Sequence, residues 1–237
     1  MKVVLGMIVR NEVPMLTRTA PINSCWPNRL AIDFLSTDGT KQFLEDHGWS
    51  VVSCGWPNDF SMARNALIHF AHAYDAIVML DADECFQPQD VPRITAMLEE
   101  HVALGFPRWN LYGENDFVPD HYPDIQRRAF HLNKGCHYIN KLHESLISPD
   151  PASLAPFHIY HYGWCKPPQA TALRCHNYNL ISQGLPIVDH FDGDYVFPHK
   201  HYPFHAPHPL HPRLVQQQHW DMGKVPEPIS REGVLCT

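Results

Sequence analysis

The chain has 237 residues, of which 44% are hydrophobic and 18% are charged. This length allows one α/β domain with an extension, or two small domains, and the composition excludes a disordered tail or a coiled coil. The longest uninterrupted aliphatic run is Ala76–Leu80, which is far short of the about 20 residues that span a membrane. We expect neither a secretory leader nor a membrane span, and the seven scattered cysteines without a C-x-x-C pair favour a reducing cytoplasm.

The formal charge of −7 is unevenly distributed along the chain. Residues 1–120 contain 8 Lys and Arg against 16 Asp and Glu, whereas residues 121–237 contain 10 against 9 and hold 14 of the 18 histidines. The first part is therefore expected to be built around carboxylates, which suits a metal site. The second part is near neutral and becomes cationic if its histidines are protonated. The total charge disfavours nucleic acid as a partner but does not exclude it for the second part.

Apolar runs alternate with helix signals through the first 112 residues. Val3–Val9 is almost continuously apolar, as in a strand that is buried on both faces of a parallel sheet. Similar strands are expected at Leu30–Leu35, Trp49–Cys54 and Ala76–Leu80, and another within Val102–Tyr112. This alternation with short links predicts an α/β fold with an open, mostly parallel sheet flanked by helices.

Prolines, glycines and capping side chains set the expected helix ends. The first expected helix begins near Pro14 and ends at Pro21, and the second is capped by Thr40 and stops at His47. The third is capped by Asp59 or Ser61 and reaches about Tyr74, and the fourth runs from Asp90 to His101.

The pattern changes after about residue 113. Shorter strands are expected at Gln126–Leu132 and Phe157–Tyr162, followed by a helix from Pro168 to Gln183. Pro198–Pro212 then holds five prolines and five histidines in fifteen residues. Because proline removes backbone donors, we expect an irregular extension that packs over the surface.

Asp81-Ala82-Asp83 follows the fourth expected strand directly, and Glu84 adds a third acid. In an extended segment the side chains of Asp81 and Asp83 point to the same side. They would lie at the carboxyl end of a strand, where open α/β sheets bind ligands. Two carboxylates suit Mg²⁺ or Mn²⁺. The alternative is an ordinary strand-end turn, in which aspartate is common.

Four segments in this order and spacing resemble glycosyltransferase family 2, which has the GT-A fold. They are Arg10-Asn11-Glu12, Asp33–Thr40, Phe60–Asn65 and Asp81–Glu84. The resemblance covers about residues 3–86 and continues more weakly to about residue 183. It implies a metal-dependent, inverting, hexosyltransferase-like enzyme that moves a sugar from a nucleotide sugar, most plausibly UDP-linked, to a soluble hydroxyl acceptor.

The resemblance also implies roles for residues of the donor side. Asp33 would accept from the N–H groups of the base, and Arg64 would neutralise the diphosphate. The alternatives are a solvated strand end for Asp33 and a surface ion pair for Arg64. The bulky Phe34-Leu35 departs from the family's pattern, and the stretch after it is mainly a turn and helix cap. The expected nucleotide- and sugar-binding residues are Arg10, Asn11, Glu12, Asp33, Asp38, Arg64, Asp81 and Ala82, with Asp81 and Asp83 also holding Mn²⁺ or Mg²⁺.

Three further segments carry the resemblance into the acceptor side. Lys141-Leu142-His143-Glu144 resembles a His-Glu element found in a subset of the family, and the stretch from Tyr122 resembles one that leads to a strand with paired basic residues. Since the transfer needs a base, we expect Glu144 in that role, with Asp124 as the second choice. His161 resembles a residue that completes the metal site, although in a chain with 18 histidines a surface or core role is more common.

These expectations divide the chain into a nucleotide-sugar-binding half (1–112), an acceptor half of the same domain (113–184) and a Pro/His-rich extension (185–237). Three alternatives stay open. The acceptor could be a hydroxymethylated base in DNA, for which salt-dependent DNA binding is the sign. A nucleotidyltransferase would usually carry a glycine-rich loop after the first strand, and this chain has none there. A non-enzymatic histidine-rich metal-binding protein leaves the motifs of the first half without a role.

Overall fold

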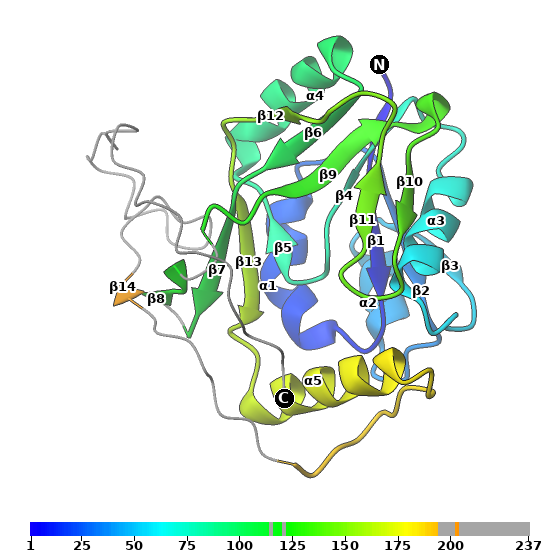
Figure 1. The fold of residues 1–237 in the computed structure, drawn as a ribbon, viewed down its shortest axis with the longest axis vertical. Helices are drawn as coiled ribbons and strands as arrows, with labels where there is room; N and C mark the ends of the chain where they lie inside the picture. Colours follow the sequence, from blue (N-terminus) through cyan, green and yellow to red (C-terminus); the bar gives the residue numbers. More distant parts are fainter. Residues whose placement is uncertain (114–115, 120–121, 194–201, 204–237) are drawn as a thin grey trace.

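The computed structural model describes residues 1–113, 116–119, 122–193 and 202–203. Its centre is a seven-stranded mixed sheet of order β12-β6-β9-β4-β1-β2-β3 (Figure 1). Within it β9 runs antiparallel to both of its neighbours, and the other pairings are parallel. The expected open, mostly parallel α/β sheet is confirmed. Its strands are β1 (Val3–Val9), β2 (Arg29–Asp33), β3 (Ser50–Ser53), β4 (Ala76–Met79), β6 (Ala103–Phe106), β9 (Gln126–His131) and β12 (Ser153–Leu154).

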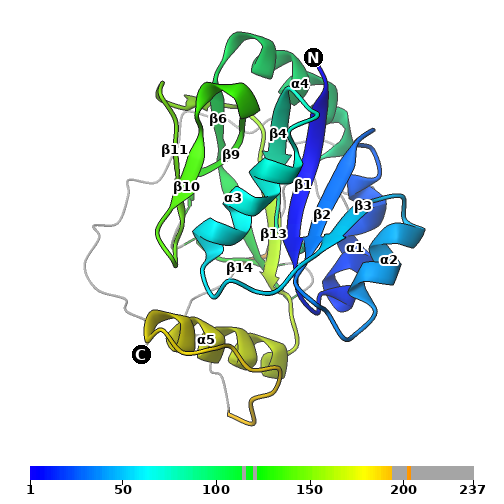
Figure 2. The same cartoon turned by 90° about the vertical axis from the view of Figure 1, so that its right-hand side faces the viewer.

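Helices cover both faces of this sheet, because the side chains of β1 alternate between two apolar clusters. Leu5 and Met7 pack with residues of α1, α2 and α4, whereas Val4 and Ile8 pack with residues of α3. Figure 2 shows α3 on one side of the sheet and α1 with α2 on the other. The helices are α1 (Val13–Asn23), α2 (Thr40–Asp46), α3 (Phe60–Phe70), α4 (Val91–Glu100) and α5 (Pro168–Ser182).

A second sheet, of order β14-β8-β7-β13-β5, extends beside the first. Here β13 lies between β7, to which it is parallel, and the short β5, to which it is antiparallel. Since β5 begins at Glu84, this pairing brings the end of the acidic motif next to His161. The strands are β5 (Glu84–Cys85), β7 (Arg108–Tyr112), β8 (Asp116–Phe117), β13 (Ile159–Trp164) and β14 (Tyr202–Pro203), and a separate hairpin is formed by β10 (His137–Ile139) and β11 (Ser145–Ile147).

The expected elements are present with bounds that differ by a few residues, and Val102–Tyr112 holds two strands, β6 and β7, instead of one. Helix α1 continues past Pro21 to Asn23, so this proline lies inside the last turn of the helix and does not end it. Helix α2 is not capped by Thr40: Gly39 is the N-cap at φ 92°, and Asp38 accepts from the Thr40 N–H and hydroxyl. Helix α3 ends at Phe70 rather than near Tyr74. Its expected cap is confirmed, since the Asp59 side chain accepts from the Met62 N–H.

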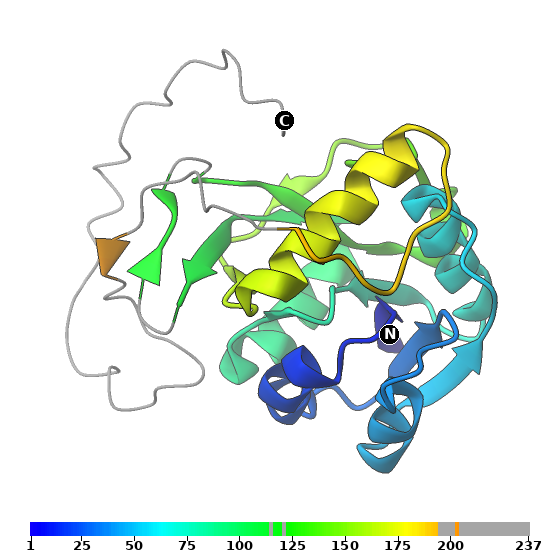
Figure 3. The ribbon, with the colours of Figure 1, turned by 90° about the horizontal axis from the view of Figure 1, so that it is seen from below.

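Helix α5 crosses the edge of the sheet where the central strands have their carboxyl ends (Figures 1 and 3). Residues 185–193 continue from it along the same edge. The Pro/His-rich stretch expected at 198–212 lies outside the described residues, apart from β14. No helix in the described part of the chain is long and apolar enough to cross a membrane.

Candidate active site

The motif residues gather at the carboxyl ends of the central strands. Arg10–Glu12 follow β1, Asp33 ends β2, and Asp81–Asp83 follow β4. Because β1, β2 and β4 are parallel neighbours, these segments meet at one edge of the sheet. Helix α5 lies over that edge (Figure 3).

Asp81-Ala82-Asp83 forms a turn, not the extended segment that we expected. The Glu84 N–H donates to the carbonyl of Asp81 over 2.9 Å, which closes the turn. The two carboxylates consequently contact different partners. Asp81 accepts from Arg64 and Arg128, each over 2.8 Å, whereas Asp83 faces Lys166 at 3.3 Å.

Asp81 belongs to an ion-pair network, here called the arginine network. Although burial raises the pKa of Asp81, Arg128 and Arg64 hold that pKa well below its usual range. Glu84 is fully buried, and burial raises its pKa, while its carboxylate still accepts from Arg108 and Arg128. The network ties β4, β7, β9 and α3 together. Its members are Arg64, Arg108 and Arg128 with Asp81, Glu84, Asp124 and Glu144.

Arg64 is only 2% exposed and holds two carboxylates of the chain itself. Its Nη2 donates to Asp81, and its Nε donates to Glu144. The buried Nη1 has no partner among the described residues. The role expected for Arg64 at the diphosphate stays a prediction, and its contacts favour positioning of Asp81 and Glu144.

Asp124, the second choice for the base, is occupied by donors. Arg108, Asn110 and Gln126 all donate to its carboxylate. Burial raises the pKa of Asp124, but Arg108 and these hydrogen bonds lower it overall. An acid whose lone pairs are already filled is a poor proton acceptor, so this environment favours Glu144.

A second group of side chains, here called the Asp83 cluster, lies between β1, β13 and α5. Asp83 itself is 6% exposed. Its Oδ1 lies 3.7 Å from His161 Nε2, and its Oδ2 lies 3.3 Å from Lys166 Nζ and 3.9 Å from Arg174 Nη1. Lys166 also donates to both oxygens of Glu12 over 2.8 and 3.0 Å.

The protonation state of His161 follows from its neighbours. Asn110 donates through Nδ2 to Asp124, which orients its amide so that Oδ1 faces His161 Nδ1 at 2.7 Å. An amide oxygen only accepts, so Nδ1 carries the proton and Nε2 presents a lone pair toward Asp83. Burial lowers the pKa of His161 to about 3, which keeps the ring neutral. Gly163 makes room for it, because a Cβ there would lie 2.3 Å from Nε2.

This pair of groups fits a divalent cation. Burial raises the pKa of Asp83, but Lys166 and His161 lower it to about 2, so the carboxylate is ionised. A carboxylate oxygen and an imidazole lone pair suit Mn²⁺, and such ions usually complete their coordination with water and substrate phosphates. In the described part of the chain no three His, Cys, Asp or Glu side chains group as metal ligands. Asp83 and His161 could therefore supply two of the ligands of such an ion.

Asp33 lies at the end of β2 and is 2% exposed. Its Oδ2 accepts from the Ser36 N–H, while its Oδ1 is buried without a partner among the described residues. An unpaired buried carboxylate oxygen is costly unless a ligand supplies a donor. Phe34 turns inward against Trp56, and Leu35, at φ 54°, is exposed.

The other residues that were expected to bind the nucleotide sugar lie nearby, but each already contacts another group of the protein. Arg10 pairs with Asp189 over 2.8 Å, and Asn11 donates weakly to the same carboxylate. Asp38 accepts from the Val13 N–H and from the Thr40 N–H at the start of α2. The carbonyl of Ala82 accepts from Thr19.

Lys166 and Arg174 were not expected at the site, yet both lie within 4 Å of the Asp83 carboxylate. Lys166 follows an expected strand and precedes an expected helix, a position where a lysine is ordinarily solvated. Its only signal was that placement at a strand–helix junction. Of the paired basic residues in the expected strand Gln126–Leu132, Arg128 is buried in the arginine network.

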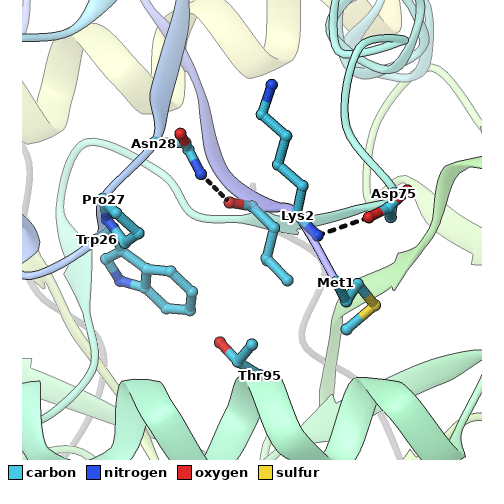
Figure 4. Close-up of a pocket in the computed structure, with 8 residues that line it drawn as sticks. Met1, Lys2, Trp26, Pro27, Asn28, Asp75 and Thr95 are labelled. Carbon is cyan, nitrogen blue, oxygen red and sulfur yellow. Dashed lines mark hydrogen bonds between the residues drawn. The ribbon is translucent and has the colours of Figure 1, made fainter.

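One cavity lies at the opposite end of the molecule (Figure 4). It has a volume of about 440 Å³ and is lined by residues at the amino ends of β1, β2 and β4, including Lys2, Asn28 and Asp75, together with Trp26 and Thr95. Because the motif residues follow the carboxyl ends of these strands, this cavity is separate from the site.

The comparison with protein families identifies the class. The model described as Glycosyl transferase family 2 matches residues 30–145, which include Asp33, Arg64, the acidic motif and Glu144. This part of the chain belongs to glycosyltransferase family 2, and the chain thus carries a glycosyltransferase domain. The narrower assignment to the subset with a His-Glu element stays a prediction.

Individual relatives are more distant. The TPR repeat-containing protein Synpcc7942_0270 of Synechococcus elongatus is 33% identical over 106 residues, which cover 44% of this chain and 26% of that protein. The chain thus spans about a quarter of this curated relative. S. aureus TarS 1-349 in complex with UDP-GlcNAc has a TM-score of 0.46 at 13% identity, covering 77% of this chain and 66% of that one. Glucosyl-3-phosphoglycerate synthase from Mycobacterium tuberculosis, with Mn²⁺, UDP-glucose and phosphoglyceric acid, has a TM-score of 0.34 at 18% identity, covering 47% and 44%.

Proposed function

We propose that this protein transfers a sugar from a UDP-linked donor to a hydroxyl acceptor, with inversion and with a divalent metal. The observation that carries the proposal is the approach of Asp83 to the neutral His161, in a family 2 domain, at the edge where α/β sheets bind ligands. Basic groups surround this pair, as an anionic diphosphate requires.

Asp83 and His161 would hold the metal, through a carboxylate oxygen and Nε2. When bound, the metal would neutralise the charge that develops on the leaving diphosphate. Asn110 keeps Nε2 of His161 unprotonated, and Asp124 in turn orients Asn110. Asp81 is held by two guanidinium groups, so we assign it to the donor sugar or ribose rather than to the metal.

The unpaired Oδ1 of Asp33 supports uracil as the base. Uracil offers a single ring N–H, which one carboxylate oxygen satisfies. Guanine would present two adjacent donors, yet the Oδ2 of Asp33 is already used by Ser36. Arg10 and Asn11 would complete the nucleoside pocket after Asp189 releases them.

Glu144 is the proposed base that removes the proton from the acceptor hydroxyl. Arg64 joins it to Asp81, which sets the carboxylate beside the donor motif. Residues 113–184, proposed as the acceptor half, supply both Glu144 and His161.

A screen of nucleotide sugars tests the proposal. Purified protein with Mn²⁺ is incubated with UDP-, GDP- and CMP-linked sugars, and the released nucleotide is measured. We expect release from UDP-sugars above the no-enzyme rate, and none after the metal is chelated. Release only from GDP or CMP donors would refute the choice of uracil, and release of pyrophosphate from nucleoside triphosphates would favour nucleotidyl transfer.

A further inference from the structure

Lys166 stands in the short link between β13 and α5, with its ammonium group directed into the donor site. Its side chain is 9% exposed, and Nζ lies within 3.3 Å of both the Glu12 and Asp83 carboxylates. Burial alone lowers the pKa of Lys166, but Asp83 and Glu12 raise it overall, so the group is charged. A lysine that is buried between two acids, one of them assigned to the metal, calls for an explanation beyond surface packing.

The charges of the Asp83 cluster balance without a metal. Glu12 and Asp83 contribute two negative charges, and Lys166 and Arg174 contribute two positive ones. A divalent cation at Asp83 and His161 would meet an ammonium group already bound to the same carboxylate. Like charges a few ångströms apart repel strongly in a partly buried site. Metal binding is therefore opposed until negative charge arrives with it.

The donor brings that negative charge. We propose that Lys166 is a diphosphate-binding residue. In the free protein its ammonium group pairs with Glu12 and Asp83, and when metal and donor bind together it changes partners and pairs with the phosphates. This inference rests on the proposed function, because it assumes a nucleoside diphosphate donor. Lysine suits the exchange, since a compact charge on a flexible stem reaches either partner without moving the backbone.

Arg174 is the less direct member of the pair. Its guanidinium lies 3.9 Å from Asp83 and 4.7 Å from the centre of the Trp164 ring. This cation–π contact restrains the position of the guanidinium. It adds positive charge to the site but has less freedom to change partners. The exchange is accordingly assigned to Lys166, and Arg174 provides a second, weaker test of the same electrostatics.

The test measures the coupling between metal and nucleotide. Binding of Mn²⁺ is followed by the electron paramagnetic resonance signal of the free ion, with no nucleotide, with UDP and with uridine. The variants are Lys166→Gln, the charge-preserving Lys166→Arg and the matched control Lys134→Gln, an exposed lysine beyond β9. Binding of UDP and uridine at saturating Mn²⁺ is measured by calorimetry.

In the wild type, UDP should strengthen Mn²⁺ binding, and uridine should not. In Lys166→Gln, Mn²⁺ without nucleotide should bind at least about tenfold more tightly, because a repelling charge is gone. Binding of UDP at saturating Mn²⁺ should weaken by at least about tenfold, while uridine changes less than about twofold. Lys166→Arg should keep the wild-type pattern of coupling, and Lys134→Gln should match the wild type throughout.

Unchanged Mn²⁺ and UDP affinities in Lys166→Gln, with normal coupling in the wild type, would overturn this inference and leave the proposed function standing. Absence of any Mn²⁺-dependent UDP binding in the wild type would refute the proposed function instead. If Lys166→Gln does not fold, Arg174→Gln carries the same test, with a rise in nucleotide-free Mn²⁺ affinity expected and an unchanged affinity counting against the proposal.

Discussion

Asp81 and Asp83 are separated by one alanine, yet they contact different parts of the protein. Asp81 is fixed by Arg64 and Arg128 inside the arginine network. Asp83 faces an imidazole on β13 and a lysine in the link that follows this strand. The turn closed by Glu84 separates the two carboxylates, so the motif combines an acid held by two guanidinium groups with one that we propose binds the metal.

Replacing Glu144 by Gln tests the proposed base at the residue scale. The amide oxygen of Gln can still accept from Arg64 Nε, so the local geometry is kept while the basic carboxylate is lost. Release of UDP from a UDP-sugar should fall by at least about a hundredfold, as is typical for loss of a general base. Calorimetric binding of UDP with Mn²⁺ should stay within about twofold of the wild type.

The matched control is Glu45→Gln, an exposed position on α2, which should retain wild-type turnover. If Glu144→Gln keeps more than a tenth of the wild-type rate, Glu144 does not act as the base. Another residue would then have to act as the base. Asp124 is unsuited to that role, because three residues already donate to its carboxylate.

The sequence marked the acidic motif and His161 as candidates through a strand end and family-like spacing, and the structure places Asp83 3.7 Å from His161, while their roles stay predictions. It was not informative for Lys166, since nothing in the local pattern separates a buried lysine from a solvated one. The partners of Asp81 could not be predicted from the sequence either, because Arg128 forms its ion pair with Asp81 only when β9 pairs with β4. Long-range contacts of this kind depend on strand pairing, which no local periodicity encodes.

At the scale of elements, hydrophobic patterning predicted most strands and helices. The apolar run Val3–Val9 is β1 to the residue, and Asp59 caps α3 as its sequence position indicates. The insertion of β9 between β4 and β6 was not predictable, because an alternating strand carries no mark of its neighbours. The division of β6 and β7 between two sheets was likewise invisible in a single apolar stretch.

Helix α5 and the segment after it contact the residues of the proposed donor site. Arg174 reaches Asp83 from the helix, and Asp189 reaches Arg10 from the segment that follows. Asn58 further donates to the carbonyl of Leu185. These contacts bring together, at one edge of the sheet, residues that the sequence analysis assigned to the donor half, the acceptor half and the extension.

Across the whole molecule, basic residues from the rest of the chain neutralise part of the negative charge that the first 120 residues bring to the site. Arg128, Lys166 and Arg174 all meet carboxylates of the first part. The uneven charge in the sequence thus reflects the way that the two parts fit together. Buried titratable groups of this kind also make the stability of the fold depend on pH.

Buried histidines predict loss of stability in mild acid. Burial lowers the pKa of His161 to about 3 and that of His158 to about 4, whereas both titrate near 6.5 in the unfolded chain. The unfolded state therefore binds more protons below pH 6.5, and the stability that is complete above this pH declines as the pH falls toward 4. Each histidine contributes up to about 1.4 kcal/mol of lost stability per pH unit in this window.

Urea unfolding between pH 7 and pH 4.5 checks this prediction. His161→Gln should show a shallower decline by about one proton, while the exposed His137→Gln should follow the wild type. An equal slope in His161→Gln and the wild type would show that His161 does not stay neutral in the fold.

The central claim is that a divalent cation at Asp83 couples to UDP, and thermal unfolding with and without Mn²⁺ tests it most directly. At a hundredfold excess over its Kd, UDP should raise the Tm of the wild type by about 5 °C or more with Mn²⁺ and by little after chelation. The Asp83→Asn variant should lose this shift, and the exposed Asp46→Asn control should keep it. Equal stabilisation by UDP without metal, or an undiminished shift in Asp83→Asn, would contradict the account.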